Sequence, residues 1–108
     1  MEEPICKLNI IYMKQYVIIA RDGTDEKALD RRMETRPGHL AGARQLKTDN
    51  HFILGGAMLN KAGQMEGSVM IVQFETEAQF QNWYNNEPYI TAGVWKTIEV
   101  KPFKVADV

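Results

Sequence analysis

The sequence has a single cysteine, two histidines and no long apolar stretch. Cys6 has no partner for a disulfide bond within the chain, so a reducing compartment fits best. No run approaches the roughly 18 to 20 apolar residues of a membrane-spanning helix. The acidic pair Glu2-Glu3 stands where a signal peptide carries basic residues. We therefore expect a cytoplasmic location, no targeting signal and no membrane partner.

An excess of charge of either sign is also missing. The chain has 13 basic and 14 acidic side chains and a net charge of −1, so no overall field favours nucleic acid. His39, His51 and Cys6 lack metal-ligand spacing, and Gly55-Gly56 does not join a strand to a helix as a dinucleotide motif does. We expect no nucleic acid partner, no metal and no cofactor.

The hydrophobic pattern predicts one α+β domain. Apolar, β-branched runs indicate four strands, and helical spacing indicates two main helices, the first broken or kinked near Thr35-Arg36 because Pro37 disfavours a helical conformation in the residue before it. Thr76 and Gln79 match a capping box at the start of the second helix. The order βαββαβ predicts a ferredoxin-like fold with a four-stranded antiparallel sheet. The strands are expected at residues 14–21, 51–59, 67–74 and 94–103, and the domain at 14–108, preceded by an N-terminal arm at 1–13.

The expected sheet has two apolar faces and too few helices to cover both. Two helical crossovers cover one face, whereas the first and third strands are apolar on each side. Burying an open face of about 600 Å² would contribute roughly 15 kcal/mol before the costs of association are subtracted. A homodimer that stacks sheet on sheet solves this most simply. The alternative is that the N-terminal arm folds over the open face.

Five short motifs follow one another along the chain: Arg36-Pro37-Gly38-His39, Gly55-Gly56, Gly67-Ser68, Glu87-Pro88-Tyr89 and Ala92-Gly93-Val94. In this order they resemble the YciI-like (YCII-related) family. The resemblance covers residues 14–104 and implies a dimeric α+β barrel whose cleft holds a histidine and an aspartate thought to form a catalytic dyad. At the aspartate position this sequence has Glu87, which is one methylene longer.

His39 and Glu87 are the best candidates for acid–base chemistry. A helix that restarts at Pro37 would place His39 near its positive end, which disfavours a charged imidazole. A neighbouring carboxylate would favour the charged form, fix one tautomer and leave the other nitrogen free. The opposing effects suit a proton-transferring histidine. The alternative is that His39 only packs and Glu87 only begins a helix.

Further residues could contact a ligand in the same cleft. Ser68 and Gly56 lie on neighbouring strands of the predicted hairpin, so the serine hydroxyl could orient a substrate. Arg36 could bind an anionic or enol oxygen, and Tyr89 could form an apolar wall. Arg31-Arg32 is interpreted as a solvated charge cluster.

Two functions remain open on these grounds. The first is a metal-independent enzyme that uses a His–Glu dyad for elimination, isomerisation or hydrolysis of a small organic molecule. The second is a non-catalytic module that binds a small ligand or a protein in the same cleft. A dimer with a purely structural role is the third possibility.

Overall fold

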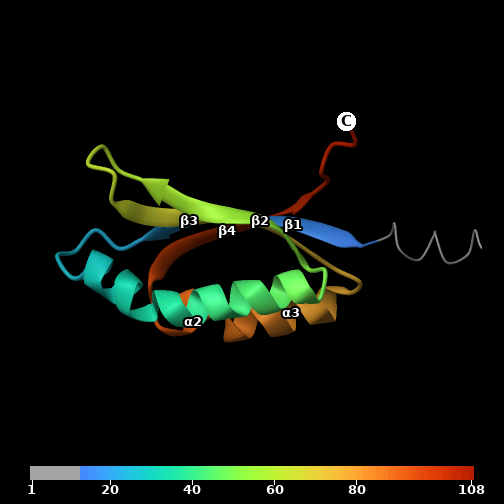
Figure 1. Ribbon diagram of the computed structural model, residues 1–108, viewed down its shortest axis with the longest axis horizontal. Helices are drawn as coiled ribbons and strands as arrows, with labels where there is room; N and C mark the ends of the chain where they lie inside the picture. The colour runs from blue at the N-terminus through green and yellow to red at the C-terminus, as the bar shows by residue number, and fades with distance from the viewer. Residues whose placement is uncertain (1–12) are drawn as a thin grey trace, which may run out of the picture.

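A computed structural model describes residues 13–108 and shows a sheet with helices on one face (Figure 1). The sheet has four antiparallel strands in the order β2-β3-β1-β4, which confirms the predicted ferredoxin-like topology. Residues 1–12, and with them most of the expected N-terminal arm, lie outside the described part. The elements are β1 (Lys14–Asp22), α2 (Ala28–Thr48), β2 (Phe52–Leu59), β3 (Met65–Phe74), α3 (Glu77–Asn86), α4 (Pro88–Thr91) and β4 (Trp95–Phe103).

The two central strands provide most of the core. β1 pairs with β3 from Lys14↔Phe74 to Arg21↔Gly67, so residues opposite one another share a face. Every second residue of each strand points toward the helices and is buried there. These positions are Tyr16, Ile18 and Ala20 in β1 and Ser68, Met70, Val72 and Phe74 in β3.

The helix α2 is continuous through Pro37, so of the predicted break or kink near Thr35-Arg36 the break is excluded. Pro37 lies inside it and is exposed, although an interior proline usually costs about 3 kcal/mol. Buried contacts hold the helix on both sides of the proline, through Arg32 before it and His39 after it. The helix begins at Ala28 without a side-chain cap. Within residues 13–108 no helix is long and apolar enough to span a membrane.

The second helical region consists of α3 and the short α4. The Thr76 hydroxyl accepts from the Gln79 amide, and the Gln79 side chain accepts from the Thr76 amide, which confirms the capping box. Glu87 then separates the two helices in an extended conformation. Gly93 adopts a φ of +71°, a value that favours glycine, and directs the chain from α4 into β4. Glu87, at the junction of α3 and α4, lies close to α2, where its side chain contacts His39.

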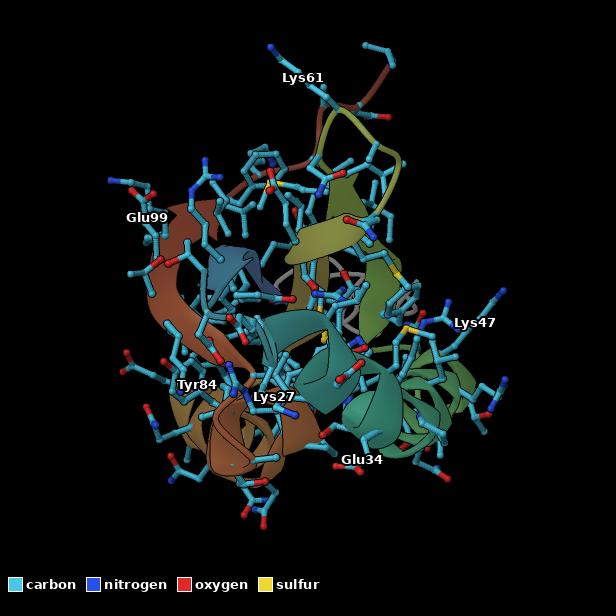
Figure 2. The ribbon with its side chains drawn as sticks, turned by 90° about the vertical axis from the view of Figure 1, so that its left-hand side faces the viewer. Lys27, Glu34, Lys47, Lys61, Tyr84 and Glu99 are labelled. Atoms are coloured by element: carbon cyan, nitrogen blue, oxygen red, sulfur yellow. The ribbon has the colours of Figure 1, made fainter. Side chains whose placement is uncertain are left out.

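The other face of the sheet has no helix against it within residues 13–108, and Figure 1 shows α2 and α3 together on the opposite side. Its centre is apolar. Leu54 and Phe103 on this face are 49% and 41% exposed. Figure 2 shows charged side chains around the domain, with Glu99 projecting from β4 and Lys61 at the tip of the β2–β3 turn. The central apolar residues are Val17, Ile19, Val69 and Ile71.

The capping box predicts a measurable contribution to stability. Thr76→Ala removes the hydroxyl that accepts from Gln79, and we expect the free energy of unfolding to fall by about 1 kcal/mol. Thr76→Ser keeps the hydroxyl and should retain most of that stability. Urea unfolding followed by circular dichroism measures both variants, and equal stability of the alanine and serine variants would contradict the prediction.

Candidate active site

His39 and Glu87 lie together under the sheet, although 48 residues separate them in the chain. His39 Nδ1 lies 2.6 Å from Glu87 Oε2, within hydrogen-bonding distance. The glutamate side chain is 2% exposed and the histidine side chain 12% exposed, so the imidazole covers the carboxylate and retains limited access to solvent. The longer side chain of glutamate therefore reaches the histidine. The catalytic role of the pair stays a prediction.

Glu87 owes its position to the start of α4. Its Oε2 accepts a hydrogen bond from the Tyr89 amide at 2.9 Å and so caps the helix, and Pro88 occupies the first helical position, where no amide hydrogen is needed. The same oxygen faces His39. A single carboxylate oxygen therefore joins α4 to α2.

Two aromatic rings fix the plane of the imidazole. The Tyr89 ring stacks on His39 with centroids 4.0 Å apart and an angle of 12° between the planes. Trp95 meets His39 edge-on at 6.0 Å and Tyr89 at 5.6 Å. Stacking and the hydrogen bond to Glu87 leave the ring little rotational freedom. The imidazole of His39 is therefore held in one orientation, as proton transfer to a bound molecule requires.

Arg32 is buried beside this cluster, so its interpretation as a solvated residue is wrong. It is 3% exposed, and its Nη1 donates to both carboxylate oxygens of Asp22 at 3.0 Å. The guanidinium carbon lies 4.8 Å from the centre of the Tyr89 ring, within range of a cation–π contact. Arg31 instead points outward to exposed Asp25. The helical phase of α2, which the strands determine, decides which arginine is buried.

Ser68 completes the buried network. Its hydroxyl oxygen accepts from Arg32 Nη2 at 2.8 Å and from the indole nitrogen of Trp95 at 3.2 Å. Sequence reasoning predicted the serine near a cleft but missed Arg32 and Asp22 as its surroundings. A buried arginine is costly unless it is paired with an anionic group. Asp22, the last residue of β1, was the residue in the sequence that could have indicated such a partner.

A pocket of about 100 Å³ opens between α2, α4 and β2, and five of the predicted site residues line it. Glu87, the sixth, lies behind His39. Gly56 has no side chain and contributes only backbone atoms. It pairs with Val69, and the residue opposite Ser68 is Ala57. Gly55 faces inward, and an added Cβ there would lie 3.1 Å from the Phe52 ring. The five are Arg36, His39, Gly56, Ser68 and Tyr89.

The lining of this pocket is electropositive. Arg32 and Arg36 contribute to it, and none of the carboxylates in the described part of the chain does. Within residues 13–108 Arg36 makes no hydrogen bond or ion pair, and the Tyr89 hydroxyl is buried without a hydrogen-bonding partner. Burial raises the pKa of Tyr89, although the nearby charges of Arg32 and Arg36 lower it. The tyrosine is therefore a neutral hydroxyl at physiological pH.

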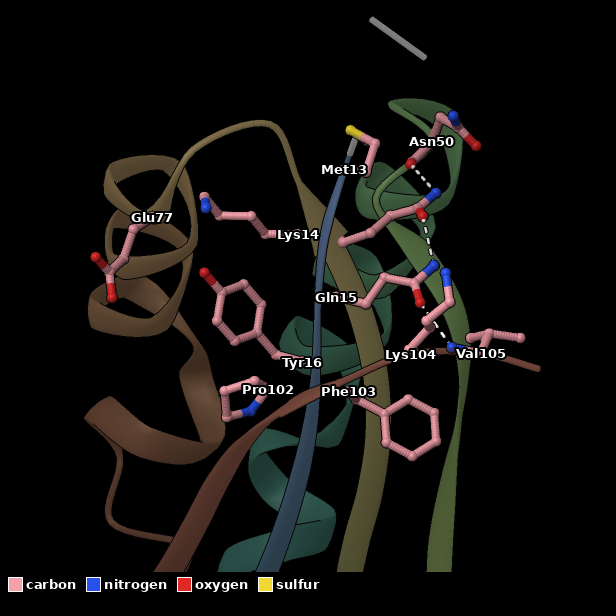
Figure 3. Close-up of a pocket in the computed structure, with 11 residues that line it drawn as sticks. Met13, Lys14, Gln15, Tyr16, Asn50, Glu77, Pro102, Phe103, Lys104 and Val105 are labelled. Atoms are coloured by element: carbon pink, nitrogen blue, oxygen red, sulfur yellow. Dashed lines mark hydrogen bonds between the residues drawn. The ribbon is translucent and has the colours of Figure 1, made fainter. Parts of the chain in front are cut away.

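A larger pocket of about 770 Å³ lies at the other end of the sheet, where β1 begins (Figure 3). Glutamines dominate its hydrogen bonds: Gln73 donates to the Asn50 carbonyl, and Gln15 links Gln73 to the Val105 amide. It contains no histidine and none of the buried arginine network. The smaller pocket is the better candidate despite its size, because the oriented imidazole and the charged groups converge there.

The fold and this site define a ferredoxin-like α+β protein with a histidine–carboxylate pair beside a small pocket. The chain belongs to the YCII-related domain family, whose domain matches residues 14–104. It is 37% identical over 95 residues to Protein YciI of Escherichia coli O6:H1, covering 82% of this chain and 95% of that protein. An uncharacterized protein of Haemophilus influenzae is 35% identical over 96 residues, with the same coverage of each chain.

Solved structures share the fold at lower sequence identity. A 5-chloro-2-hydroxyhydroquinone dehydrochlorinase of Burkholderia phenoliruptrix AC1100, in complex with 2,5-dihydroxybenzoquinone, superposes with a TM-score of 0.71 at 24% identity, covering 85% of this chain and 95% of that chain. A dimeric ferredoxin-like protein of unknown function from Jannaschia sp. CCS1 gives 0.51 at 19% identity, covering 85% and 99%. These likenesses establish the architecture.

Substitutions at the two neighbouring arginines should differ in how much stability they remove. Arg32→Ala leaves Asp22 buried without its partner, and we expect a loss of about 3–5 kcal/mol or failure to fold. Arg31→Ala removes only an exposed pair and serves as the matched control, with a much smaller effect. Chemical denaturation measures both variants. Equal losses would show that the buried pair does not hold α2 to β1.

Proposed function

We propose that this chain is an enzyme that moves a proton on a small organic molecule, with His39 as general base and acid and Glu87 as its orienting partner. The observation that supports this most directly is the 2.6 Å contact between His39 Nδ1 and Glu87 Oε2 at the wall of a pocket. A buried carboxylate that accepts from Nδ1–H leaves the lone pair of Nε2 available. Arg36, Ser68 and Tyr89 are proposed substrate contacts, and Gly56 a backbone wall.

The proposed chemistry needs only these side chains. Nε2 of His39 takes a proton from a carbon next to a carbonyl or from a ring hydroxyl, and the electrons of the broken bond move onto the substrate oxygen. A leaving group departs with its bonding electrons in an elimination, and the proton returns to another carbon in an isomerisation. In a hydrolysis Nε2 instead takes a proton from the attacking water. The absence of a metal or cofactor requirement remains a prediction.

The comparisons are compatible with this chemistry. The dehydrochlorinase with the same fold is named for the loss of a chlorine substituent from a hydroxylated ring. A cofactor-independent oxygenase from Streptomyces nogalater also shares the fold, at 13% identity and a TM-score of 0.53. Elimination from a small oxygenated ring is therefore the reaction to test first.

Exchange of carbon-bound hydrogen tests the proposed base directly. The chain should catalyse incorporation of deuterium from heavy water into a member of a panel of enolisable and phenolic compounds, followed by proton NMR. His39→Gln should slow this exchange by at least about a hundredfold, because a positioned general base contributes that much. His51→Gln, which changes the other histidine of the sequence, is the matched control and should exchange normally.

Binding without exchange in any compound of the panel would favour the alternative, a non-catalytic binding module. Glu87→Gln separates the two roles of the carboxylate. Its amide oxygen still accepts from the Tyr89 amide, whereas the negative charge beside His39 is lost. A catalytic dyad predicts slower exchange in this variant with nearly unchanged thermal stability.

We also propose that two copies pack through the open face of the sheet and form a homodimer. Partly exposed apolar side chains fill the centre of this face, and no helix within residues 13–108 covers it. Its β4 edge carries Glu99 and Lys101, which suits the rim of an interface more than its centre. The structural relative from Jannaschia is named as a dimeric ferredoxin-like protein. The alternative cover, the N-terminal arm, lies outside the described residues.

Light scattering coupled to gel filtration tests this assembly. We expect the unmodified chain to have twice the monomer mass at micromolar concentration. Ile71→Lys places a charge at the centre of the open face and should yield monomers, because an unpaired charge is strongly disfavoured in a buried interface. Glu34→Lys, on the exposed side of α2 (Figure 2), controls for the added charge and should remain dimeric. A monomeric unmodified chain would refute the proposal.

A further inference from the structure

The hydrogen of the Ser68 hydroxyl has no acceptor among residues 13–108, although the side chain is buried. Ser68 is 2% exposed, and its oxygen receives two hydrogen bonds. Both donors, a guanidinium and an indole N–H, have no acceptor capacity. The serine oxygen must therefore act as acceptor to both, which uses its two lone pairs. Only its O–H remains, and Ser68 lines the small pocket.

Arg32 determines this orientation. Its guanidinium is held by two hydrogen bonds to Asp22, so Nη2 is fixed 2.8 Å from the serine oxygen. A cation that donates to a hydroxyl oxygen also draws electron density from it and strengthens its O–H as a donor. Arg32 thus acts through Ser68, without itself needing to touch a ligand.

The remaining polar groups of the pocket also favour a ligand that accepts hydrogen bonds. The buried hydroxyl of Tyr89 has no partner, and Arg36 makes no ion pair within residues 13–108. Among the residues that the structure describes, neither Asp nor Glu lines the pocket, because Asp22 and Glu87 lie behind Arg32 and His39. A ligand meets hydrogen-bond donors and positive charge there, with few acceptors. The pocket therefore favours an oxygen acceptor and disfavours an amino group in the same place.

We propose that Ser68, oriented by the positioning residue Arg32, is the specificity-determining donor of this pocket, and that the ligand is a single-ring or smaller anion presenting a phenolate or enolate oxygen to it. This inference rests on the proposed function and names its substrate class. The volume agrees with a small ring, since an apolar cavity of about 150 Å³ takes up benzene and this pocket is of the same order. Leu40 and Phe52 also line the pocket, and their apolar side chains suit contact with the face of a ring.

Two probes of one framework test the donor. 4-Nitrophenolate presents an anionic oxygen, and 4-nitroaniline presents a donor amino group of nearly the same size. We expect the unmodified chain to bind the phenolate about tenfold to a hundredfold more tightly, which is the worth of one hydrogen bond to a charged group. Absorbance titration of each probe, at a pH where the phenol is ionised, gives the two dissociation constants.

Three variants assign the preference to the network. Ser68→Ala should lower the ratio of the nitroaniline dissociation constant to the nitrophenolate dissociation constant by about tenfold, because only the smaller contribution of Arg36 to the preference remains. Trp95→Phe, which removes the indole N–H together with one ring, and Arg32→Lys, which keeps the charge but loses the fork geometry, should each lower the ratio less. Thr97→Ala, an exposed residue of β4, is the control and should keep it. Thermal unfolding of each variant separates a lost preference from a lost fold.

Binding of neither probe, equal binding of both, or an unchanged ratio in Ser68→Ala would overturn the proposal. If Arg32→Lys does not fold, Ser68→Ala and Trp95→Phe still decide it. These results are separable from the proposed catalysis, because deuterium exchange that depends on His39 would stand even if the probes showed no preference. Conversely, a phenolate preference without exchange would support the pocket's specificity in a binding protein.

Discussion

The ion pair between Asp22 and Arg32 is the interaction on which the site depends. Asp22 ends a central strand and Arg32 lies in the long helix, so the pair fixes where the helix sits along the sheet. Both side chains are almost fully buried, and such a pair is tolerated only when its hydrogen bonds are well satisfied. Ser68 and the Tyr89 ring provide further contacts for the guanidinium. The position of the histidine, seven residues further along α2, follows from this anchor.

The second constraint comes from α4. A four-residue helix is too short to be stable alone, and it depends on its cap and its packing. Tyr89 is 1% exposed, and its ring lies between the histidine and the buried arginine. The chain therefore orients its imidazole with one long helix, one short turn of helix and a strand. Each of these elements is anchored in the core beneath the sheet.

Much of the fold could be predicted from the sequence, because periodicity and turn residues report local structure. The alternation in β1 and β3 and the Thr76–Gln79 capping box led to the correct order of elements. The helix is not broken at Pro37, since tertiary contacts on both sides outweigh a local preference. Local rules describe what a segment favours in isolation, and α2 is not isolated.

The site was predictable only where a motif marked it. His39 and Glu87 stood out because short motifs surround them, and the structure brings the two side chains together. Nothing local distinguishes Arg31 from Arg32, since they are neighbours in α2 and differ only in the direction they face. That direction depends on the packing of α2 against a strand far away in the sequence. Buried polar networks of this kind are therefore hard to see in a single sequence.

The capping role of Glu87 has a consequence for interpreting variants. One oxygen atom begins a helix and also contacts the imidazole, so a substitution that removes it disturbs architecture and reactivity together. Loss of activity after such a change would not by itself identify the carboxylate as part of the chemistry. Any residue placed at this position must satisfy a backbone amide and a side chain with the same group.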